Sequence, residues 1–345
     1  MTDTARGVDR ARWEQLPGPV RGAVEERLGA RVVGVGAVTG GFSHGMAARL
    51  ELGDGRAVFG KAIRTDDRLI ESYRTEAATG LVLPPGVPAP RMLFSVSVAD
   101  WLVMVFEFVA GRHPRFDRPA ELIAAIEAVE CALRVSTPAP VAGLVGIEDA
   151  LGPSFTAWRD FSAGGPPADL DPWARAHLDE LAALESQWSL GVAGDTLLHN
   201  DLRPDNMLLR ADGTVALVDW AWTCRGAAWV DLACLLPELL DAGADPDRVL
   251  TRPLVAAVDP RAIDALCCAL CGFWERNSRL PAPAHRNCGP FRSAGPGSRG
   301  SGSRAAFPGD RRQSVTSGGI SGKPSLARSF SAIAVRRSAD SALRS

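Results

Sequence analysis

Apolar positions in the first 111 residues fall in short runs that predict β-strands. The runs are rich in branched or aromatic residues and are bounded by glycine, proline or charged positions: 31–38, 46–52, 56–63, 91–98 and 101–111. Gly53, Asp54 and Gly55 supply a turn signal between the second and third runs. The stretches 19–29 and 66–83 read as helices, the second ending before Pro84. The pattern predicts a five-stranded sheet with one inserted helix.

After residue 111 the periodicity becomes helical. Residues 119–136 and 172–189 carry apolar side chains at i, i+3, i+4 and i+7, and 230–243 and 260–277 also read as helices. Short apolar runs within 197–220 interrupt them with a hairpin, whose turn at Ala211, Asp212 and Gly213 would bring Asn206 and Asp219 towards each other. We therefore expect a sheet-containing N-terminal part followed by a mostly helical part.

The overall composition is that of an ordinary globular protein. Hydrophobic residues make up 46% and charged residues 23% of 345 positions, enough for two lobes. The chain has no apolar run of about 18 residues, and its charged start does not resemble a signal peptide. We predict a cytoplasmic protein with no membrane partner. Cys268 and Cys271 form the one CxxC, which we interpret as small buried hydrophobes rather than zinc ligands.

Charge is unevenly distributed along the chain. Residues 281–345 hold 11 Lys and Arg against 2 Asp and Glu, leaving residues 1–280 with 27 against 38, a net of −11. An acidic body makes nucleic acid an unlikely partner, although a basic-tailed nucleic-acid binder remains an alternative. The tail contains 13 Ser and 9 Gly without a sustained period. We interpret it as disordered or as an out-of-frame reading that replaces native C-terminal helices.

Lys61 is a candidate phosphate-binding residue. The chain uses 36 Arg and only two Lys, yet one lysine lies in the middle of an apolar strand. A compact ammonium is therefore required there, unless the side chain lies at a strand edge and reaches water. Glu76 is the expected ion-pair partner and Glu71 the second choice. The preceding Gly40, Gly41 and Gly45 would allow backbone N–H groups to approach phosphates, or form only a turn.

The stretch LLHNDLRPDNMLLRADGTVALVDW, residues 197–220, carries the strongest chemical signal. It places Asp201 and Asn206 in a short loop after His199, and Asp219 just beyond the next apolar run. Asp201 would orient a substrate hydroxyl, while Asn206 and Asp219 offer the hard oxygen ligands that Mg²⁺ prefers. Arg203 would meet a phosphate oxygen or form a surface ion pair. The alternative is that the polar residues cap turns and helices.

These motifs over residues 18–280 resemble the aminoglycoside phosphotransferase and choline kinase-type family. The resemblance implies an α+β, two-lobed protein-kinase-like fold that binds ATP and Mg²⁺. It places an N-lobe at 1–106, a hinge at 107–112, a helical C-lobe at 113–280 and the low-complexity tail at 281–345. The implied activity is ATP-dependent phosphorylation of a hydroxyl on a small, possibly cationic molecule. The alternative is a non-catalytic, nucleotide-binding protein of the same fold.

The resemblance also implies roles for individual residues. Asp201 matches the catalytic aspartate, and Asp231 matches an acidic residue that braces the catalytic loop. The backbone of Glu107 and Val109 would meet adenine. Asn200 and Gly60 depart from the family pattern, which has glycine and a branched apolar residue there. For a cationic acceptor, the candidate acidic residues are Asp169, Asp171, Asp179, Glu238 and Asp241.

Overall fold

The computed structural model describes residues 11–37 and 45–279 and divides the chain into two compact units. Unit 1 contains the chain up to Leu144 together with Ala193–Val258, and unit 2 contains Val145–Val192 and the chain from Asp259. Gly40, Gly41 and the tail at 281–345 lie outside the described residues. The lobe boundaries proposed from the sequence stay a prediction. Within the described ranges, no helix is long and apolar enough to span a membrane.

Unit 1 begins with the five-stranded antiparallel sheet that the sequence predicts. Its strands are β1 (Val32–Ala37), β2 (Met46–Leu52), β3 (Ala57–Arg64), β4 (Met92–Val98) and β5 (Trp101–Glu107), in the order β1-β2-β3-β5-β4. The expected turn joins β2 to β3, with Gly55 at φ +86°. Ala99 and Asp100, both at positive φ, form the tight connection between β4 and β5.

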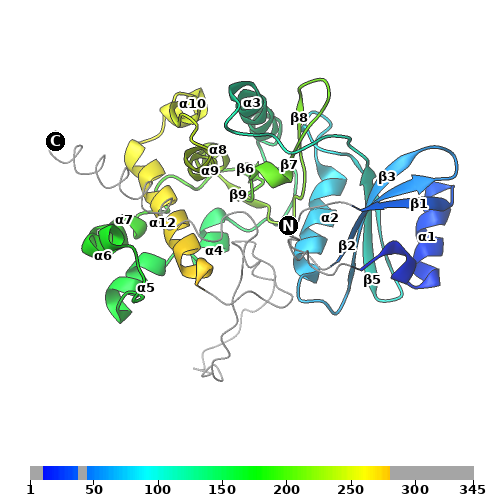
Figure 1. Ribbon diagram of the computed structural model, residues 1–345, viewed down its shortest axis with the longest axis horizontal. Coiled ribbons are helices and arrows are strands. Elements are labelled where there is room, and N and C mark those ends of the chain that lie inside the picture. Colours follow the sequence, from blue (N-terminus) through cyan, green and yellow to red (C-terminus); the bar gives the residue numbers. More distant parts are fainter. Residues whose placement is uncertain (1–10, 38–44, 280–345) are drawn as a thin grey trace, which may run out of the picture. The chain divides into compact units, whose positions relative to one another are not determined.

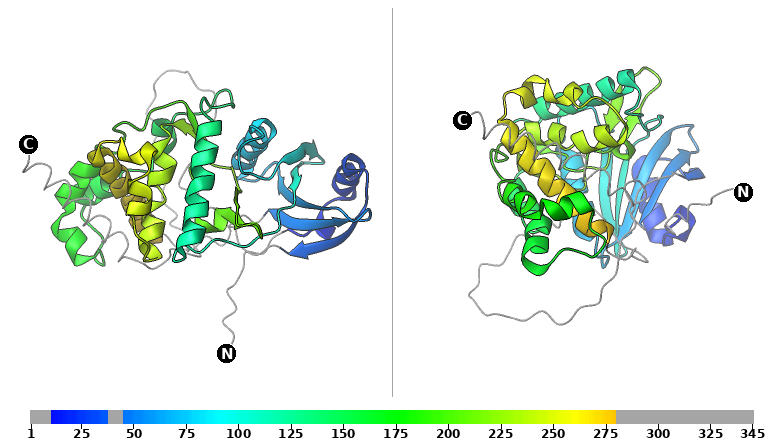
Figure 2. Two further views of the ribbon diagram at one scale, coloured as in Figure 1. Left: turned by 90° about the horizontal axis from the view of Figure 1, so that it is seen from above. Right: turned by 60° about the vertical axis from the view of Figure 1, so that its left-hand side comes forward.

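One helix covers each face of this sheet (Figures 1 and 2). A short 3₁₀ turn, η1 (Trp13–Gln15), precedes α1 (Gly18–Leu28), which packs on the face carrying Ala62. The inserted helix α2 (Ile70–Val82) packs on the opposite face, which carries Ile63. Because side chains alternate along a strand, Lys61 faces the same side as Ile63. The alternation of side chains along β3 therefore points Lys61, the one lysine of the sheet, towards α2.

The rest of unit 1 consists of short elements around a long helix. Helix α3 (Pro119–Val135) packs against two small sheets, one pairing β6 (Thr196–Leu198) with β9 (Cys224–Gly226) and the other β7 (Met207–Leu209) with β8 (Val215–Leu217). The remaining elements are η2 (Pro204–Asn206), α8 (Trp229–Ala233), α9 (Leu236–Asp241), α10 (Asp247–Leu250) and α11 (Pro253–Ala256). The helix expected at 230–243 is split into α8 and α9, with Pro237 in the first turn of α9, because proline has no N–H to donate within a helix.

Unit 2 is entirely helical in its described part. Its elements are α4 (Ile147–Leu151), α5 (Ala157–Gly164), α6 (Pro172–Ala176), α7 (Leu178–Glu185) and α12 (Pro260–Ser278). The helix α12 agrees with the prediction for 260–277, whereas 172–189 is interrupted at His177 and ends at Glu185. Cys267, Cys268 and Cys271 are fully buried in α12, as expected for small hydrophobes.

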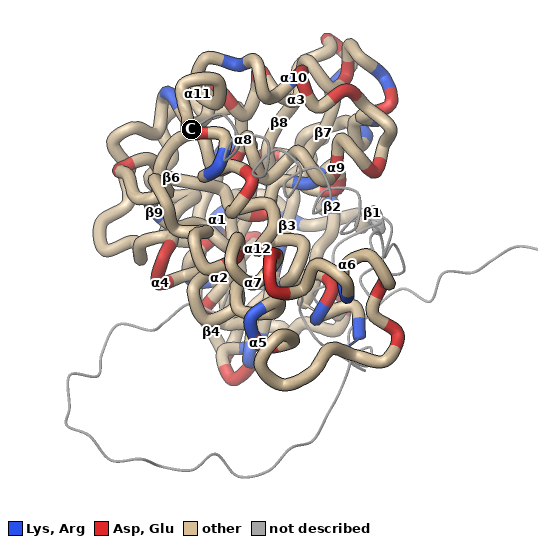
Figure 3. The backbone as a smooth tube through the Cα atoms, turned by 90° about the vertical axis from the view of Figure 1, so that its left-hand side faces the viewer, with Lys and Arg blue, Asp and Glu red and all other residues tan. Residues whose placement is uncertain are grey.

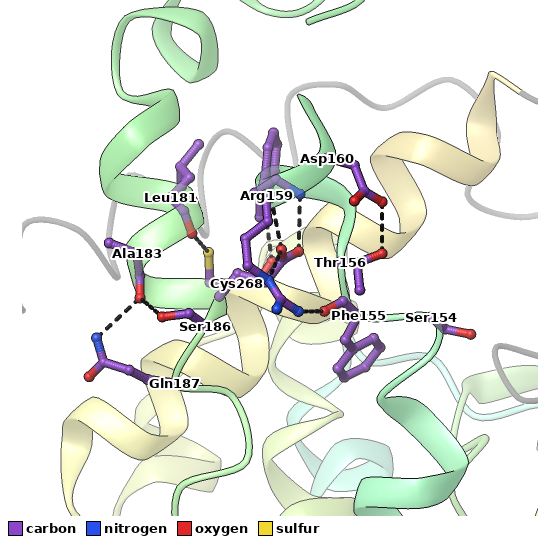
Figure 4. Close-up of polar contacts among 12 residues, drawn as sticks. Ser154, Phe155, Thr156, Arg159, Asp160, Leu181, Ala183, Ser186, Gln187 and Cys268 are labelled. Atoms are coloured by element: carbon purple, nitrogen blue, oxygen red, sulfur yellow. Dashed lines mark hydrogen bonds and ion pairs between the residues drawn. The ribbon is translucent and has the colours of Figure 1, made fainter. Parts of the chain in front are cut away.

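Polar contacts join the helices of unit 2. The buried Glu185 carboxylate accepts from the backbone N–H groups of Trp158 and Arg159, both at 3.1 Å, so it satisfies donors in the first turn of α5. Figure 4 shows Arg159 also donating to the Phe155 carbonyl at 2.6 Å, and the Cys268 thiol contacting the Leu181 carbonyl. Acidic and basic positions are interspersed around these helices (Figure 3).

The packing of α12 on α5 predicts that a methyl group added at Gly272 destabilises the protein, whereas one added at Gly164 does not. A Cβ at Gly272 would lie 2.7 Å from the Trp158 ring and 3.1 Å from Glu185 Oε1, whereas a Cβ at Gly164 has open space. Gly272→Ala should therefore lower the free energy of unfolding by about 1–3 kcal/mol. The control Gly164→Ala should change it by less than about 0.5 kcal/mol. Urea denaturation checks both, and equal effects would contradict the packing described.

Candidate active site

Lys61 is held between two carboxylates at the α2 face of the sheet. Its Nζ lies 2.5 Å from Glu76 Oε2 and 2.9 Å from Asp219 Oδ1, and it is also 5.3 Å from the centre of the Tyr73 ring. Glu71, the second choice of partner, instead pairs with Arg74 at 2.6 Å on the exposed side of α2. The strand β3, the helix α2 and the segment after β8 thus meet at one ammonium group.

Burial and charge act against each other in this cluster. Burial alone would lower the pKa of Lys61, but the carboxylates of Asp219 and Glu76 raise it well above its ordinary value. Burial raises the pKa of Glu76 to about 7, against the opposing effect of Lys61. Burial would also raise the pKa of Asp219, yet Lys61 holds it below its ordinary value. Asp219 is therefore ionised near neutral pH.

The loop that follows β6 is fixed by one buried carboxylate. Asp231, 2% exposed on α8, accepts from the backbone N–H groups of His199 at 2.7 Å and Asn200 at 3.0 Å. Burial raises the pKa of Asp231 to about 6, and the two N–H donors oppose the shift. Asn200 adopts φ +64°, which asparagine tolerates better than most residues. This conformation explains how asparagine occupies the position where the resemblance expects glycine.

His199 supports the loop as a neutral ring. Its Nε2 lies 2.9 Å from the Val218 carbonyl, to which it must donate, and its Nδ1 lies 3.4 Å from the Asp201 N–H. Its ring packs on Trp220, with 4.7 Å between centroids. Burial lowers the pKa of His199 to about 4. Trp220 is 5% exposed, so it contributes packing below the loop.

Asp201 and Asn206 are joined directly. The Asn206 amide nitrogen donates to the Asp201 backbone carbonyl at 2.7 Å and to Asp201 Oδ2 at 3.0 Å. Because both partners accept, the amide oxygen of Asn206 is turned away from Asp201. Burial raises the pKa of Asp201 to about 7.

The β7–β8 hairpin sets the spacing between Asn206 and Asp219. Its turn is closed by the Arg210 N–H to the Thr214 carbonyl at 2.8 Å, with Gly213 at φ +84°. At its open end, Val218 N–H donates to the Asn206 carbonyl at 2.9 Å. Asp219, at φ +66°, follows at once. The turn predicted from Ala211, Asp212 and Gly213 therefore brings the two oxygen-bearing side chains to the same end of the hairpin.

Arg203 lies among carboxylates beside the loop. Its Nη2 is 3.1 Å from Asp205 Oδ2 and its Nε is 3.7 Å from Asp201 Oδ1. Glu238 on α9 also acts on Arg203 electrostatically, and burial raises the pKa of Glu238 to about 7.

Among the other acidic candidates, three have local structural partners in unit 2. Asp169 pairs with Arg279, Asp171 caps α6, and Asp179 accepts from Ser162.

The predicted hinge residues stand at the end of β5. Glu107 is the last residue of the strand, and its N–H donates to the Arg91 carbonyl at 2.9 Å. Val109 follows two residues later and is partly buried. At Gly60, a Cβ would lie 3.0 Å from Leu50 and 3.2 Å from Met46, so the absence of a side chain relieves crowding on β2.

Sequence reasoning missed three residues that contact this site. Tyr73 and Thr79 lie three residues before and after Glu76 on α2, and Thr79 contacts Thr223 at 3.0 Å. For the two α2 residues, the available signal was the helical spacing of polar side chains, whereas no local pattern indicated Thr223.

A comparison with protein families matches residues 38–278 to the phosphotransferase enzyme family, which covers more than half of the chain. The chain belongs to the phosphotransferase enzyme family. A comparison with curated protein sequences gives no match.

Solved structures show which fold this phosphotransferase-family chain adopts. An aminoglycoside phosphotransferase from Alicyclobacillus acidocaldarius is 16% identical, with a TM-score of 0.51, and the match covers 72% of this chain and 82% of the other. A thermostable mutant of aminoglycoside phosphotransferase APH(4)-Ia, in complex with ADP and hygromycin B, is 14% identical with a TM-score of 0.50, covering 73% and 88%. The predicted protein-kinase-like fold is confirmed.

The buried His199 ring predicts a pH dependence of stability in this family member. Its folded pKa of about 4 lies below the ordinary value of 6.5, so the unfolded chain takes up the proton first. The stability due to neutral His199 is present above pH 6.5 and is lost as the pH falls towards 4. Between those values, the free energy of unfolding should fall by about 2–3 kcal/mol more in the wild type than in His199→Gln. If urea denaturation gave the same pH dependence of the free energy of unfolding for both proteins, His199 would not be the buried neutral group described.

Proposed function

We propose that this protein transfers the γ-phosphoryl group of ATP to a hydroxyl group of a small molecule. The observation that carries the proposal is the pair of clusters described above, Lys61 with Glu76 and Asp219, and Asp201 with Asn206. Phosphoryl transfer needs a cation at the phosphates, ligands for a metal ion and a carboxylate at the acceptor. The clusters contain one candidate for each. The cytoplasm, where ATP is abundant, is the proposed compartment.

Lys61 is the proposed phosphate-binding cation. Its ammonium is fixed from one side by Glu76 and retains its charge because both neighbouring carboxylates raise its pKa. A phosphate oxygen entering this position would replace or share the contact with Asp219. Glu107 and Val109 are the proposed adenine contacts, through their backbone groups. Gly40 and Gly41, which lie outside the described residues, stay candidates for backbone contacts with the phosphates.

Asn206 and Asp219 are the residues that would hold Mg²⁺. An amide oxygen and an ionised carboxylate are hard donors, and the Asn206 oxygen is turned away from Asp201 by its own amide bonds. No group of three or more His, Cys, Asp or Glu suited to a metal occurs among the described residues. Two protein ligands fit an ion that takes its remaining ligands from phosphates and water. Bound there, Mg²⁺ would neutralise phosphate charge.

Asp201 is the proposed catalytic residue. In the transfer, the acceptor oxygen forms a bond to the γ-phosphorus, the bond to the β,γ-bridging oxygen breaks, and ADP leaves with that electron pair. The acceptor proton passes to the Asp201 carboxylate. Asn206 fixes the orientation of that carboxylate, and His199 and Asp231 hold the loop backbone. Arg203 would offset negative charge beside it.

The proposed acceptor is a small hydroxylated molecule. One feature of the site, its acidic groups near Asp201, supports an acceptor that carries a positive charge. Asp205 lies next to Arg203, and Glu238, whose pKa is raised to about 7 by burial, adds a second acidic group there. An ammonium group on the acceptor would interact favourably with them. The related APH(4)-Ia structure contains hygromycin B, a polyhydroxylated compound, which makes aminocyclitols the first acceptors to test.

Asp201→Asn separates an enzyme from a nucleotide-binding scaffold. Asparagine keeps an oxygen for Asn206 but cannot take the acceptor proton, so turnover should fall by about 10²–10⁴-fold. MgATP should still raise the melting temperature of the variant. ADP release with aminocyclitols, choline and neutral polyols measures turnover, and differential scanning fluorimetry measures binding.

Two further variants complete this test. Asp219→Ala should abolish the MgATP-dependent shift, because it removes a proposed metal ligand. Asp212→Asn, an exposed carboxylate in the same hairpin, should behave as the wild type, since asparagine retains the oxygen that accepts from Thr214. Equal turnover in Asp201→Asn and the wild type would overturn the catalytic assignment.

A further inference from the structure

The segment that carries Asp219 is attached to the N-terminal half of unit 1 on both sides of that residue. Before Asp219, the Leu217 N–H donates to the Pro88 carbonyl at 2.7 Å, in the connection between α2 and β4. After it, the Thr223 hydroxyl lies 3.0 Å from the Thr79 hydroxyl of α2. Between these points, Asp219 itself contacts Lys61. The seven-residue segment Leu217–Thr223 is thus held by contacts at both of its ends and at the Asp219 side chain.

The same segment is attached to the catalytic loop. The Val218 carbonyl accepts from His199, and the Trp222 carbonyl accepts from the Asn200 side chain at 3.3 Å. Leu217–Thr223 therefore joins the helix α2 to the loop that carries Asp201. A displacement of its Thr223 end would move Asp219 relative to both.

Thr79 and Thr223 form this distal attachment inside the unit. Thr79 is fully buried and Thr223 is 4% exposed. Buried hydroxyl groups require partners, because an unpaired one loses its hydrogen bonds to water without replacement. Valine would fill the same volume at both positions without that requirement. A pair of threonines instead fixes the distance and direction between α2 and the segment.

The helical position of Thr79 links it to Lys61. Tyr73, Glu76 and Thr79 follow one another at intervals of three residues, so Glu76 is a helical neighbour of both of the others on α2. Tyr73 and Glu76 contact Lys61, and Thr79 contacts the segment that follows Asp219. The helix α2 thus contacts Lys61 directly and, through Thr223, the segment that carries Asp219.

The backbone of Asp219 is consistent with such an attachment. At φ +66° it lies in the left-handed region, which aspartate tolerates better than most residues and which surrounding contacts stabilise. The contacts of Leu217 and Thr223 enclose it from either side.

We propose that the Thr79–Thr223 hydroxyl pair is a positioning link that holds the Asp219 carboxylate where it binds the metal–nucleotide complex. This rests on the proposed function, because it assigns Thr79 and Thr223 a role at the same nucleotide site. Neither residue touches the nucleotide; both act through Asp219.

The test compares single and double valine substitutions by scanning fluorimetry, with ATP fixed and Mg²⁺ varied. Thr79→Val or Thr223→Val leaves one buried hydroxyl unpaired and should lower the melting temperature of the nucleotide-free protein. The double variant leaves neither unpaired and should recover that temperature. It should nevertheless need about fivefold more Mg²⁺ for half of the ATP-dependent shift, the loss expected from one hydrogen bond. The conservative pair Thr79→Ser and Thr223→Ser should restore the wild-type Mg²⁺ dependence.

A control for substituting two threonines uses another threonine pair of unit 1, in which Thr196 is buried and Thr137 is exposed. Thr137 and Thr196 join their hydroxyls at 2.8 Å between the end of α3 and β6. Their double valine variant should leave the Mg²⁺ dependence unchanged.

The outcomes separate the two proposals. A wild type without any Mg²⁺-dependent ATP shift overturns the proposed function and the link with it. A responsive wild type whose Thr79→Val, Thr223→Val double variant has the same Mg²⁺ dependence overturns only the link, since a merely structural pair recovers stability and binding together.

Discussion

A buried ammonium group between two carboxylates is the interaction on which the site depends. Removing one partner of a buried ion pair leaves a charge without compensation and costs about 3–5 kcal/mol in comparable proteins. Lys61 therefore requires Glu76 and Asp219 together. That condition is met only when β3, α2 and the segment after β8 take their observed places. The sheet, the helix and the hairpin are fixed relative to one another by the same cluster that would bind the phosphates.

The loop that carries Asp201 is held by a second buried carboxylate rather than by regular structure. Asp231 accepts two successive backbone N–H groups, and neutral His199 connects the loop to Val218 beside Asp219. Asn200 and Asp219 both take left-handed backbone conformations within this network. Strained backbone at two adjacent functional segments, each surrounded by hydrogen bonds, is typical of active sites. It explains why Asp201 and Asn206 can be held in place although η2 and β7 are each only three residues long.

Features set by neighbouring residues could be predicted from the sequence, whereas features set by contacts between distant residues could not. Strand alternation and turn residues are local, so the five strands, α2 and α12 were predictable, as was the direction of Lys61 within its strand. The polar spacing in 197–220 likewise placed Asn206 and Asp219 at one end of a hairpin. The Thr79–Thr223 contact spans 144 residues and involves two ordinary threonines, so no local pattern could indicate it. Pro237 accounts locally for the break before Leu236, whereas the break at His177 depends on tertiary packing, which overrides helical periodicity.

The MgATP-dependent rise in melting temperature of a Lys61→Arg variant shows whether the ion cluster around Lys61 organises the nucleotide site. Arginine keeps the positive charge, but its planar guanidinium is larger than an ammonium and meets carboxylates with a different geometry. We expect a folded variant that lacks the MgATP shift of the wild type, since the group between Glu76 and Asp219 must be compact. A Lys61→Arg protein that binds MgATP as the wild type does would contradict the claim that this ion cluster organises the nucleotide site.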